Sequence, residues 1–168
     1  MHHSRLVGGF AALAVLLILV TAPVASAAPA GIQAPGPRDR ADLRSVQSSA
    51  RTGFQAARLA RRQLGVPYVF GGASPTGFDA SGLTMYVYAQ LGVALAHGAT
   101  DQQKASQPIS LGKLRRGDLV FWGSKEYSRY VAIYVGHGRV ISAPHAGTLV
   151  SFGTIQGAWI GGRLLPVR

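Results

Sequence analysis

The residues with the clearest chemical potential lie in one short segment, Phe78-Asp-Ala-Ser-Gly-Leu83. The Asp79 carboxylate is a good helix N-cap because it can accept hydrogen bonds from the free backbone N–H groups of a first turn. Ser81 adds a hydroxyl, which would need a neighbouring base before it could attack a carbonyl. The chain has no cysteine, which excludes both a thiol nucleophile and disulfides. The residue types therefore favour a helix-start hydrogen bond for Ser81, with a serine nucleophile as the alternative.

Three histidines beyond this segment, His97, His137 and His145, fall in loop-like stretches without metal-ligand spacing. Because cysteine ligands are lacking as well, the sequence predicts no zinc site and no other metal or cofactor. His145 follows Ser142 by three residues, an offset that points the two side chains to opposite faces of an extended strand unless Pro144 turns the chain. We expect His145 to lie in a loop beside a binding groove; a plain surface histidine is the alternative.

Two helical segments would position these groups. Between residues 43 and 64 the apolar residues recur at steps of three and four, the period of an amphipathic helix, and Gly65 is a plausible stop. A second helix is predicted to begin after Asp79 and to end at Gly92. The apolar positions are Leu43, Val46, Ala50, Phe54, Ala57, Ala60 and Leu64 in the first helix and Leu83, Val87 and Leu91 in the second.

The C-terminal half changes to short runs of β-branched and aromatic residues separated by turn residues, the pattern of strands. Helices followed by strands predict an α+β domain, with N-terminal helices packed on one face of a five- to six-stranded antiparallel sheet. The strands are predicted at residues 119–122, 130–135, 139–143, 148–152 and 159–167.

The first 27 residues have the pattern of a signal peptide. Arg5 precedes an apolar run, and Ala25-Ser26-Ala27 supplies the small residues that a cleavage site requires. The run is short for a membrane span, which needs about 20 residues; a retained anchor is the alternative. Residues 28–42, rich in Pro, Ala and Gly, are predicted to form a linker, and residues 43–168 a single domain.

The chain is strongly basic, with 17 Lys and Arg against six Asp and Glu and a net charge of +11. Positive charge attracts polyanions of any kind. Export would remove nucleic acid as a partner and leave the anionic polymers of a cell wall. A row of arginines on the polar face of the first predicted helix is either a solvated face or a contact with such a polymer. The row comprises Arg44, Arg51, Arg58, Arg61 and Arg62.

Four segments carry a set of motifs in a fixed order. Residues 63–72, QLGVPYVFGG, resemble QLGxPYxWGG, and residues 78–83, FDASGL, resemble FDCSGL. Residues 114–122, LRRGDLVFW, resemble LxPGDLVFF, and residues 130–136, YVAIYVG, resemble HVGIYVG. Together these segments resemble the NlpC/p60 family of papain-like peptidoglycan endopeptidases over residues 54–167. The resemblance implies a papain-like fold and a place in the cell envelope.

In that family a cysteine opens the second helix, a histidine begins a strand, and a polar residue on the neighbouring strand orients the histidine. The resemblance places these groups at Ala80, Tyr130 and Ser142, so none of the three is intact. A tyrosine of the family falls on Tyr68, twelve residues before Ala80. One residue along a helix rotates a side chain by about 100°, so Ser81 is not expected to replace the nucleophile.

A methyl group cannot attack a carbonyl, and an unperturbed phenol, with a pKa of about 10, is a poor base near neutral pH. The resemblance therefore implies an exported, non-catalytic domain that binds the stem peptides of peptidoglycan. Two alternatives stay open: an active hydrolase with relocated catalytic residues, and an envelope interaction protein that works through its basic surface. The residues expected to contact the ligand are Tyr68, Asp79, Ser81, Tyr130, Ser142 and His145.

Overall fold

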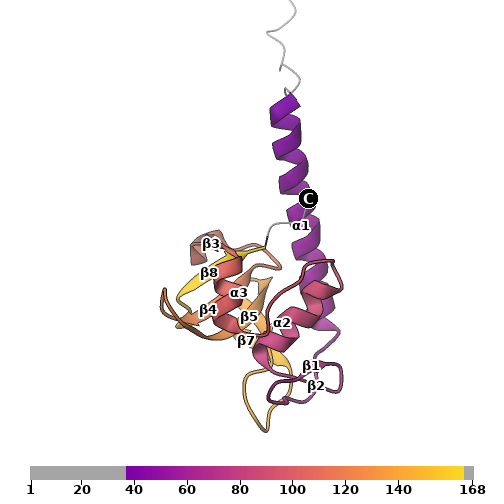
Figure 1. Cartoon of the computed structure of the whole chain (residues 1–168), viewed down its shortest axis with the longest axis vertical. Helices are drawn as coiled ribbons and strands as arrows, with labels where there is room; N and C mark the ends of the chain where they lie inside the picture. The colour runs from indigo at the N-terminus through magenta and orange to yellow at the C-terminus, as the bar shows by residue number, and fades with distance from the viewer. Residues whose placement is uncertain (1–36, 165–168) are drawn as a thin grey trace, which may run out of the picture. The chain divides into compact units, whose positions relative to one another are not determined.

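A computed structural model describes residues 37–164 (Figure 1). The predicted signal peptide, the linker up to residue 36 and the last four residues lie outside the described residues. The helices are α1 (Pro37–Arg61), α2 (Ala80–Ala89), α3 (Ala99–Ala105) and a short 3-10 turn (Leu111–Lys113). The strands are β1 (Ala73–Ser74), β2 (Gly77–Phe78), β3 (Gln107–Ile109), β4 (Leu119–Gly123), β5 (Ser128–Gly136), β6 (Arg139–Ser142), β7 (Ser151–Thr154) and β8 (Ile160–Arg163).

Helix α1 begins at Pro37, six residues before the predicted start at Leu43, and takes up the end of the predicted linker. Proline is well tolerated in a first helical turn, because the N–H that it lacks would have no partner there. The predicted apolar face is buried only near the C-terminal end: Ala57 and Ala60 are buried, whereas Val46 and Phe54 are about half exposed. The domain therefore covers only the last turns of α1 (Figure 1).

Helix α2 confirms the second predicted helix. Asp79 is its N-cap, with an extended backbone, and the helix ends shortly before Gly92, where a φ of +76° turns the chain. The buried face of α2 includes Leu83 and Val87, two of the three predicted apolar positions. Thus the head of α2 lies where the FDASGL segment was expected to place it.

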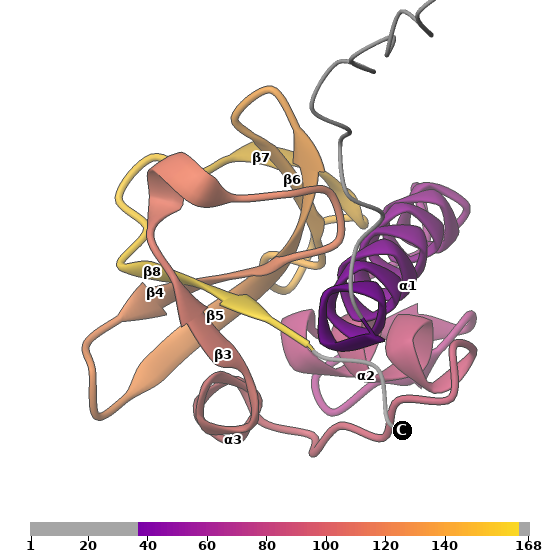
Figure 2. The same cartoon turned by 90° about the horizontal axis from the view of Figure 1, so that it is seen from above.

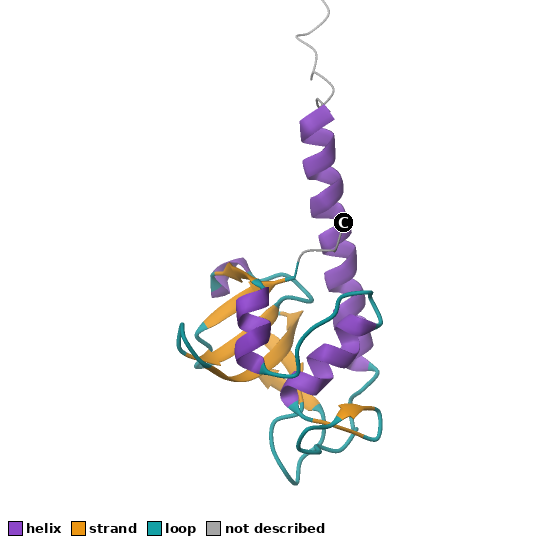
Figure 3. Ribbon diagram, in the orientation of Figure 1, coloured by secondary structure: helices purple, strands orange, loops and turns teal. Residues whose placement is uncertain are grey.

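Six strands form one antiparallel sheet in the order β3-β8-β4-β5-β6-β7. The strands are drawn in orange in Figure 3. Four of the five predicted strands are confirmed, with boundaries moved by one to four residues at most ends. The predicted strand 148–152 lies later, at Ser151–Thr154, because residues 145–149 form a turn and isolated pairings instead. Helix α3 and strand β3 were not predicted; both are short and lack a strong apolar period.

The main core lies between the sheet and helices α1 and α2, which run together along one side of the sheet (Figure 2). Side chains alternate along a strand, so Leu119 and Phe121 join this core, while Val120 joins a smaller cluster with Ala132 and Val140. The predicted α+β architecture is confirmed. No helix within residues 37–164 is long and apolar enough to cross a membrane.

Candidate functional site

A cleft of about 380 Å³ opens at the head of α2. Its walls come from the segment before α2, from the first residues of α2, from the α3 start and from the chain around β5. Four of its residues were singled out by sequence as ligand contacts: Tyr68, Asp79, Ser81 and Tyr130. Ala80, the position that the resemblance gives to a nucleophile, also lines the cleft. The structure therefore gathers residues separated by more than sixty positions into one cavity.

The carboxylate of Asp79 organises the head of α2. Its Oδ1 accepts hydrogen bonds from the backbone N–H of Gly82, at 2.6 Å, and from the Ser81 hydroxyl, at 3.0 Å. Its Oδ2 accepts from the backbone N–H of Gly71, at 3.0 Å, in the turn that precedes the helix. The bond from Gly82 satisfies a free backbone donor of the first helical turn, which is the usual role of an N-cap carboxylate. Ser81 thus forms the helix-start hydrogen bond that the sequence favours.

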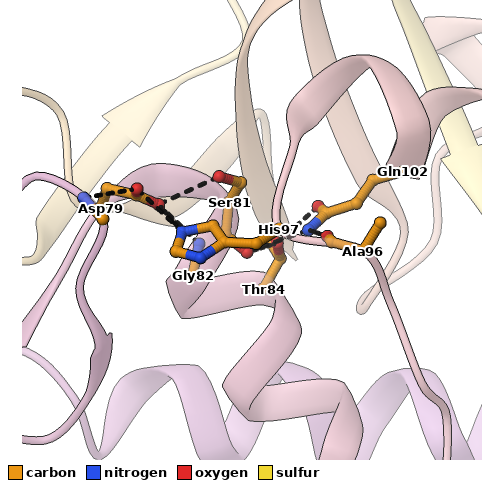
Figure 4. Close-up of polar contacts among 8 residues, drawn as sticks. Asp79, Ser81, Gly82, Thr84, Ala96, His97 and Gln102 are labelled. Atoms are coloured by element: carbon orange, nitrogen blue, oxygen red, sulfur yellow. Dashed lines mark hydrogen bonds and ion pairs between the residues drawn. The ribbon is translucent and has the colours of Figure 1, made fainter.

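His97 reaches the same carboxylate from the loop between α2 and α3 (Figure 4). Its Nε2 lies 2.9 Å from Oδ2 and 3.0 Å from Oδ1 of Asp79. Burial would raise the pKa of Asp79, but the hydrogen bonds that the carboxylate accepts, chiefly from Gly82, hold that pKa below its ordinary value. The sequence placed His97 in a loop and missed this contact, because no sequence period links positions 18 residues apart across a loop.

The order of these contacts determines what they can do chemically. In a hydrolytic triad the imidazole stands between the nucleophile and the carboxylate, so that it can remove the proton from the nucleophile. Here the Asp79 carboxylate stands in the middle and contacts both Ser81 and His97 (Figure 4). A carboxylate with a lowered pKa is a weak base for a serine hydroxyl. The geometry therefore gives Ser81 a hydrogen-bonding role and leaves its hydroxyl without an activating imidazole.

Tyr130 and Ser142 are joined to each other across β5 and β6. The Tyr130 hydroxyl and the Ser142 hydroxyl form a hydrogen bond, and the Tyr130 ring meets Trp122 edge-on, with ring centroids 5.1 Å apart. Burial raises the pKa of Tyr130, and the hydrogen bond to Ser142 offsets only part of that rise. Ser142 is 4% exposed and does not line the cleft. It lies behind Tyr130, which does line the cleft and to which it is hydrogen-bonded.

His145 is exposed in the turn after β6, where its Nδ1 lies 3.0 Å from the Ala146 carbonyl oxygen. Its neighbour Pro144 lines the cleft, whereas His145 does not. His145 thus lies in a loop beside the cleft, and its contact with a ligand stays a prediction. Within the described residues, no three His, Asp or Glu side chains are grouped to hold a metal ion.

A buried amide holds the head of α2, the His97 loop and α3 in register. Gln102 is fully buried, and its Nε2 donates to the carbonyl oxygens of Ser81, at 2.9 Å, and Ala96, at 2.7 Å. Its Oε1 accepts from the Thr84 hydroxyl at 2.5 Å (Figure 4). Three elements of the cleft therefore depend on one side chain.

We expect Gln102→Ala to lower the free energy of unfolding by about 3 kcal/mol, because buried polar groups left without partners cost about 1–3 kcal/mol each. Urea unfolding followed by circular dichroism would measure the change. Gln90→Ala, the same truncation at an exposed position after α2, should change stability by less than about 0.5 kcal/mol. Equal losses in the two variants would contradict the role given to Gln102.

Comparison with known proteins gives a consistent result. The NlpC/P60 family matches residues 65–168. Protein P54 of Enterococcus faecium is 43% identical over 98 residues, which cover 58% of this chain and 19% of P54. The peptidoglycan endopeptidase RipA of Mycolicibacterium smegmatis is 35% identical over 112 residues, covering 59% of this chain and 22% of RipA.

Solved structures with a similar fold belong to the same family. The crystal structure of the NlpC/p60 domain of the peptidoglycan hydrolase SagA superposes with a TM-score of 0.64 at 37% sequence identity, covering 67% of this chain and 98% of that domain. The chain spans only about a fifth of the length of the curated relatives P54 and RipA, so the shared part is one domain of those proteins. The family match over residues 65–168 includes the cleft-lining residues, α2 and the six-stranded sheet described above. The chain belongs to the NlpC/P60 family.

Proposed function

We propose that this chain is an exported, non-catalytic domain that binds peptidoglycan stem peptides in the cleft at the head of α2. The observation that carries the proposal is Ala80. Its methyl group lines the cleft at the first position of α2, where the FDCSGL motif has cysteine. Relatives that share this domain are named as peptidoglycan endopeptidases, which supports peptidoglycan as the ligand.

Three features argue against turnover. A methyl group has no electron pair with which to attack a carbonyl. The buried phenol of Tyr130 has a pKa above its ordinary value, so it is a poor general base at neutral pH. The carboxylate of Asp79 separates Ser81 from His97, so the relocated-hydrolase alternative lacks an imidazole on the nucleophile.

Binding does not require the nucleophile, because a peptidase groove holds its substrate through contacts that precede bond cleavage. The cleft is lined by four aromatic residues, Tyr68, Phe70, Tyr127 and Tyr130, and by Ser81. Arg129 and Asp101 add one charge of each sign to its walls. A stem peptide carries amides, carboxylates and amines, which such a mixed lining can recognise.

Two measurements on the pure natural chain test the proposal. Sedimentation with insoluble peptidoglycan should show binding that persists at about 1 M salt, where charges farther apart than roughly 3 Å are screened. Mass spectrometry of the supernatant should show no released stem-peptide fragments. Release of fragments would establish the hydrolase alternative, and binding that disappears at high salt would favour the basic-surface alternative.

A further inference from the structure

A second cavity, of about 220 Å³, lies against the C-terminal half of α1. Its lining shares none of the residues of the cleft at the head of α2. It is lined by Phe54, Ala57, Arg58, Arg61 and Arg116, and we call it the arginine pocket. Three arginine side chains thus line a mainly apolar pocket, together with the half-exposed ring of Phe54.

The third arginine reaches α1 through an unusually close backbone contact. A Cβ on Gly53 would lie 2.3 Å from the carbonyl oxygen of Arg116, and a Cβ on Gly117 would lie 2.2 Å from the Gly53 Cα. Only glycine at both positions lets the turn before β4 approach α1 so closely. Arg116 occupies the position of proline in the LxPGDLVFF motif, so this chain places a cation where the motif has none.

The guanidinium groups have no acidic partner among the described residues. Within residues 37–164 the ion pairs are His97 with Asp79 and Arg163 with Asp118. Arg61 is also held over the Phe152 ring, with its guanidinium carbon 5.6 Å from the ring centroid. The pocket therefore presents partly ordered positive charge that no described carboxylate neutralises.

Arginine forks match the oxygen geometry of phosphate and can donate two hydrogen bonds to one such group. Beyond the pocket, Arg44 and Arg51 precede Arg58 by two equal steps of seven residues, so all three share one face of α1. The row spans roughly 21 Å at 1.5 Å per residue. A row of cations leading into a pocket fits a chain of repeating anionic groups better than a single ion.

We propose that the arginine pocket binds a phosphate group of a phosphodiester-linked cell-wall polymer, with the α1 row following the polymer chain. The choice of a wall polymer over nucleic acid rests on the proposed export. A membrane surface is less suited, because among the α1 residues whose side chains are described only Val46 and Phe54 are large, apolar and exposed, too few for an interfacial helix. The domain would then hold peptide and polymer at separate sites.

Binding of soluble poly(glycerol phosphate) to the full chain, measured by calorimetry, tests the proposal. The variant Arg61→Gln/Arg116→Gln should bind at least about tenfold more weakly, the expected effect of losing hydrogen bonds to a charged group. The control Lys104→Gln/Lys125→Gln removes the same charge from exposed positions outside the pocket and should lose no more than about twofold. Equal losses in the two variants, or no binding of the polymer by the natural chain, would overturn the proposal.

Two further arms keep the outcome unambiguous. Arg61→Lys/Arg116→Lys keeps the charge but not the fork, so it should still lose part of the affinity even if the glutamine variant is unstable. Vesicles that contain phosphatidylglycerol replace the polymer in a parallel titration; stronger, pocket-dependent binding to vesicles would assign the pocket to membranes and overturn the polymer proposal.

A phosphate-free stem peptide should bind all pocket variants as it binds the natural chain. Failure of that peptide to bind the natural chain would count against the proposed function of the cleft and not against the pocket.

Discussion

The triple variant Ala80→Cys/Tyr130→His/Ser142→His is expected to release stem-peptide fragments from peptidoglycan that the natural chain leaves intact. Position 80 is the first residue of α2, where the partial positive charge of the helix N-terminus favours a thiolate. Ala80 and Tyr130 line the same cleft, so an imidazole at 130 would face a thiol at 80. The hydrogen bond between Tyr130 and Ser142 shows that positions 130 and 142 are within contact distance. The scaffold therefore brings positions 80 and 130 to one cleft and positions 130 and 142 into contact, and this proximity is the basis of the prediction.

The release of fragments should be followed by mass spectrometry, with an expected gain of at least about 100-fold over the natural chain, since general acid–base catalysis alone contributes about 10²–10⁴-fold. A matched control carries the same two histidines with Ala89→Cys, which puts the thiol at the exposed far end of the same helix. The control should release nothing. If the triple variant folds, binds peptidoglycan and still cuts nothing, the assignment of these positions as a former catalytic site is wrong.

Much of the fold could be predicted because its signals are local. The N-cap Asp79, the apolar spacing of α2 and the runs of β-branched and aromatic residues in β4 and β5 each concern residues within a few positions of one another. The exposed half of α1 could not be predicted. Its apolar period is regular, but whether a face is buried depends on how far the domain extends along the helix.

The residues of the candidate site could largely be predicted from the sequence, but the contacts between them could not. Tyr68, Ala80 and Tyr130 were placed together by motif resemblance, and the structure brings all three to one cleft. The contact of His97 with Asp79 and the buried amide of Gln102 carry no sequence signal, because loops bring these side chains across gaps of 18 residues or more. His145 lies in the turn beside Pro144 of the cleft wall, and its contact with a ligand stays a prediction.

The arginine pocket could not be predicted from the sequence either. The α1 arginines are visible as a row in the sequence, but Arg116 joins them only because two glycines let the chain pass unusually close to α1. Its position was part of a motif match, and the departure from proline had no evident meaning until the fold placed it beside Arg58 and Arg61. The arginine row of α1 and the arginine in place of the motif proline therefore line the same pocket, although they lie far apart in the sequence.

The substitution Ala80→Trp is expected to abolish most stem-peptide binding while leaving the polymer site unchanged. Ala80 is partly exposed at the cleft, so an indole at this position would occupy space that the ligand needs. Forcing a ligand past added bulk costs about 1–3 kcal/mol, which corresponds to a loss of roughly 10- to 100-fold in affinity.

Calorimetry with a soluble stem peptide would measure this loss, and Ala89→Trp, at the exposed end of the same helix, is the matched control and should bind as the natural chain does. Binding of poly(glycerol phosphate) by Ala80→Trp should stay within about twofold of the natural chain, because the arginine pocket shares no lining residue with the cleft. Undiminished peptide binding by Ala80→Trp would place the peptide somewhere other than the head of α2. Parallel loss of peptide and polymer would mean that the two ligands share one surface, and the picture of two separate sites on one domain would have to be given up.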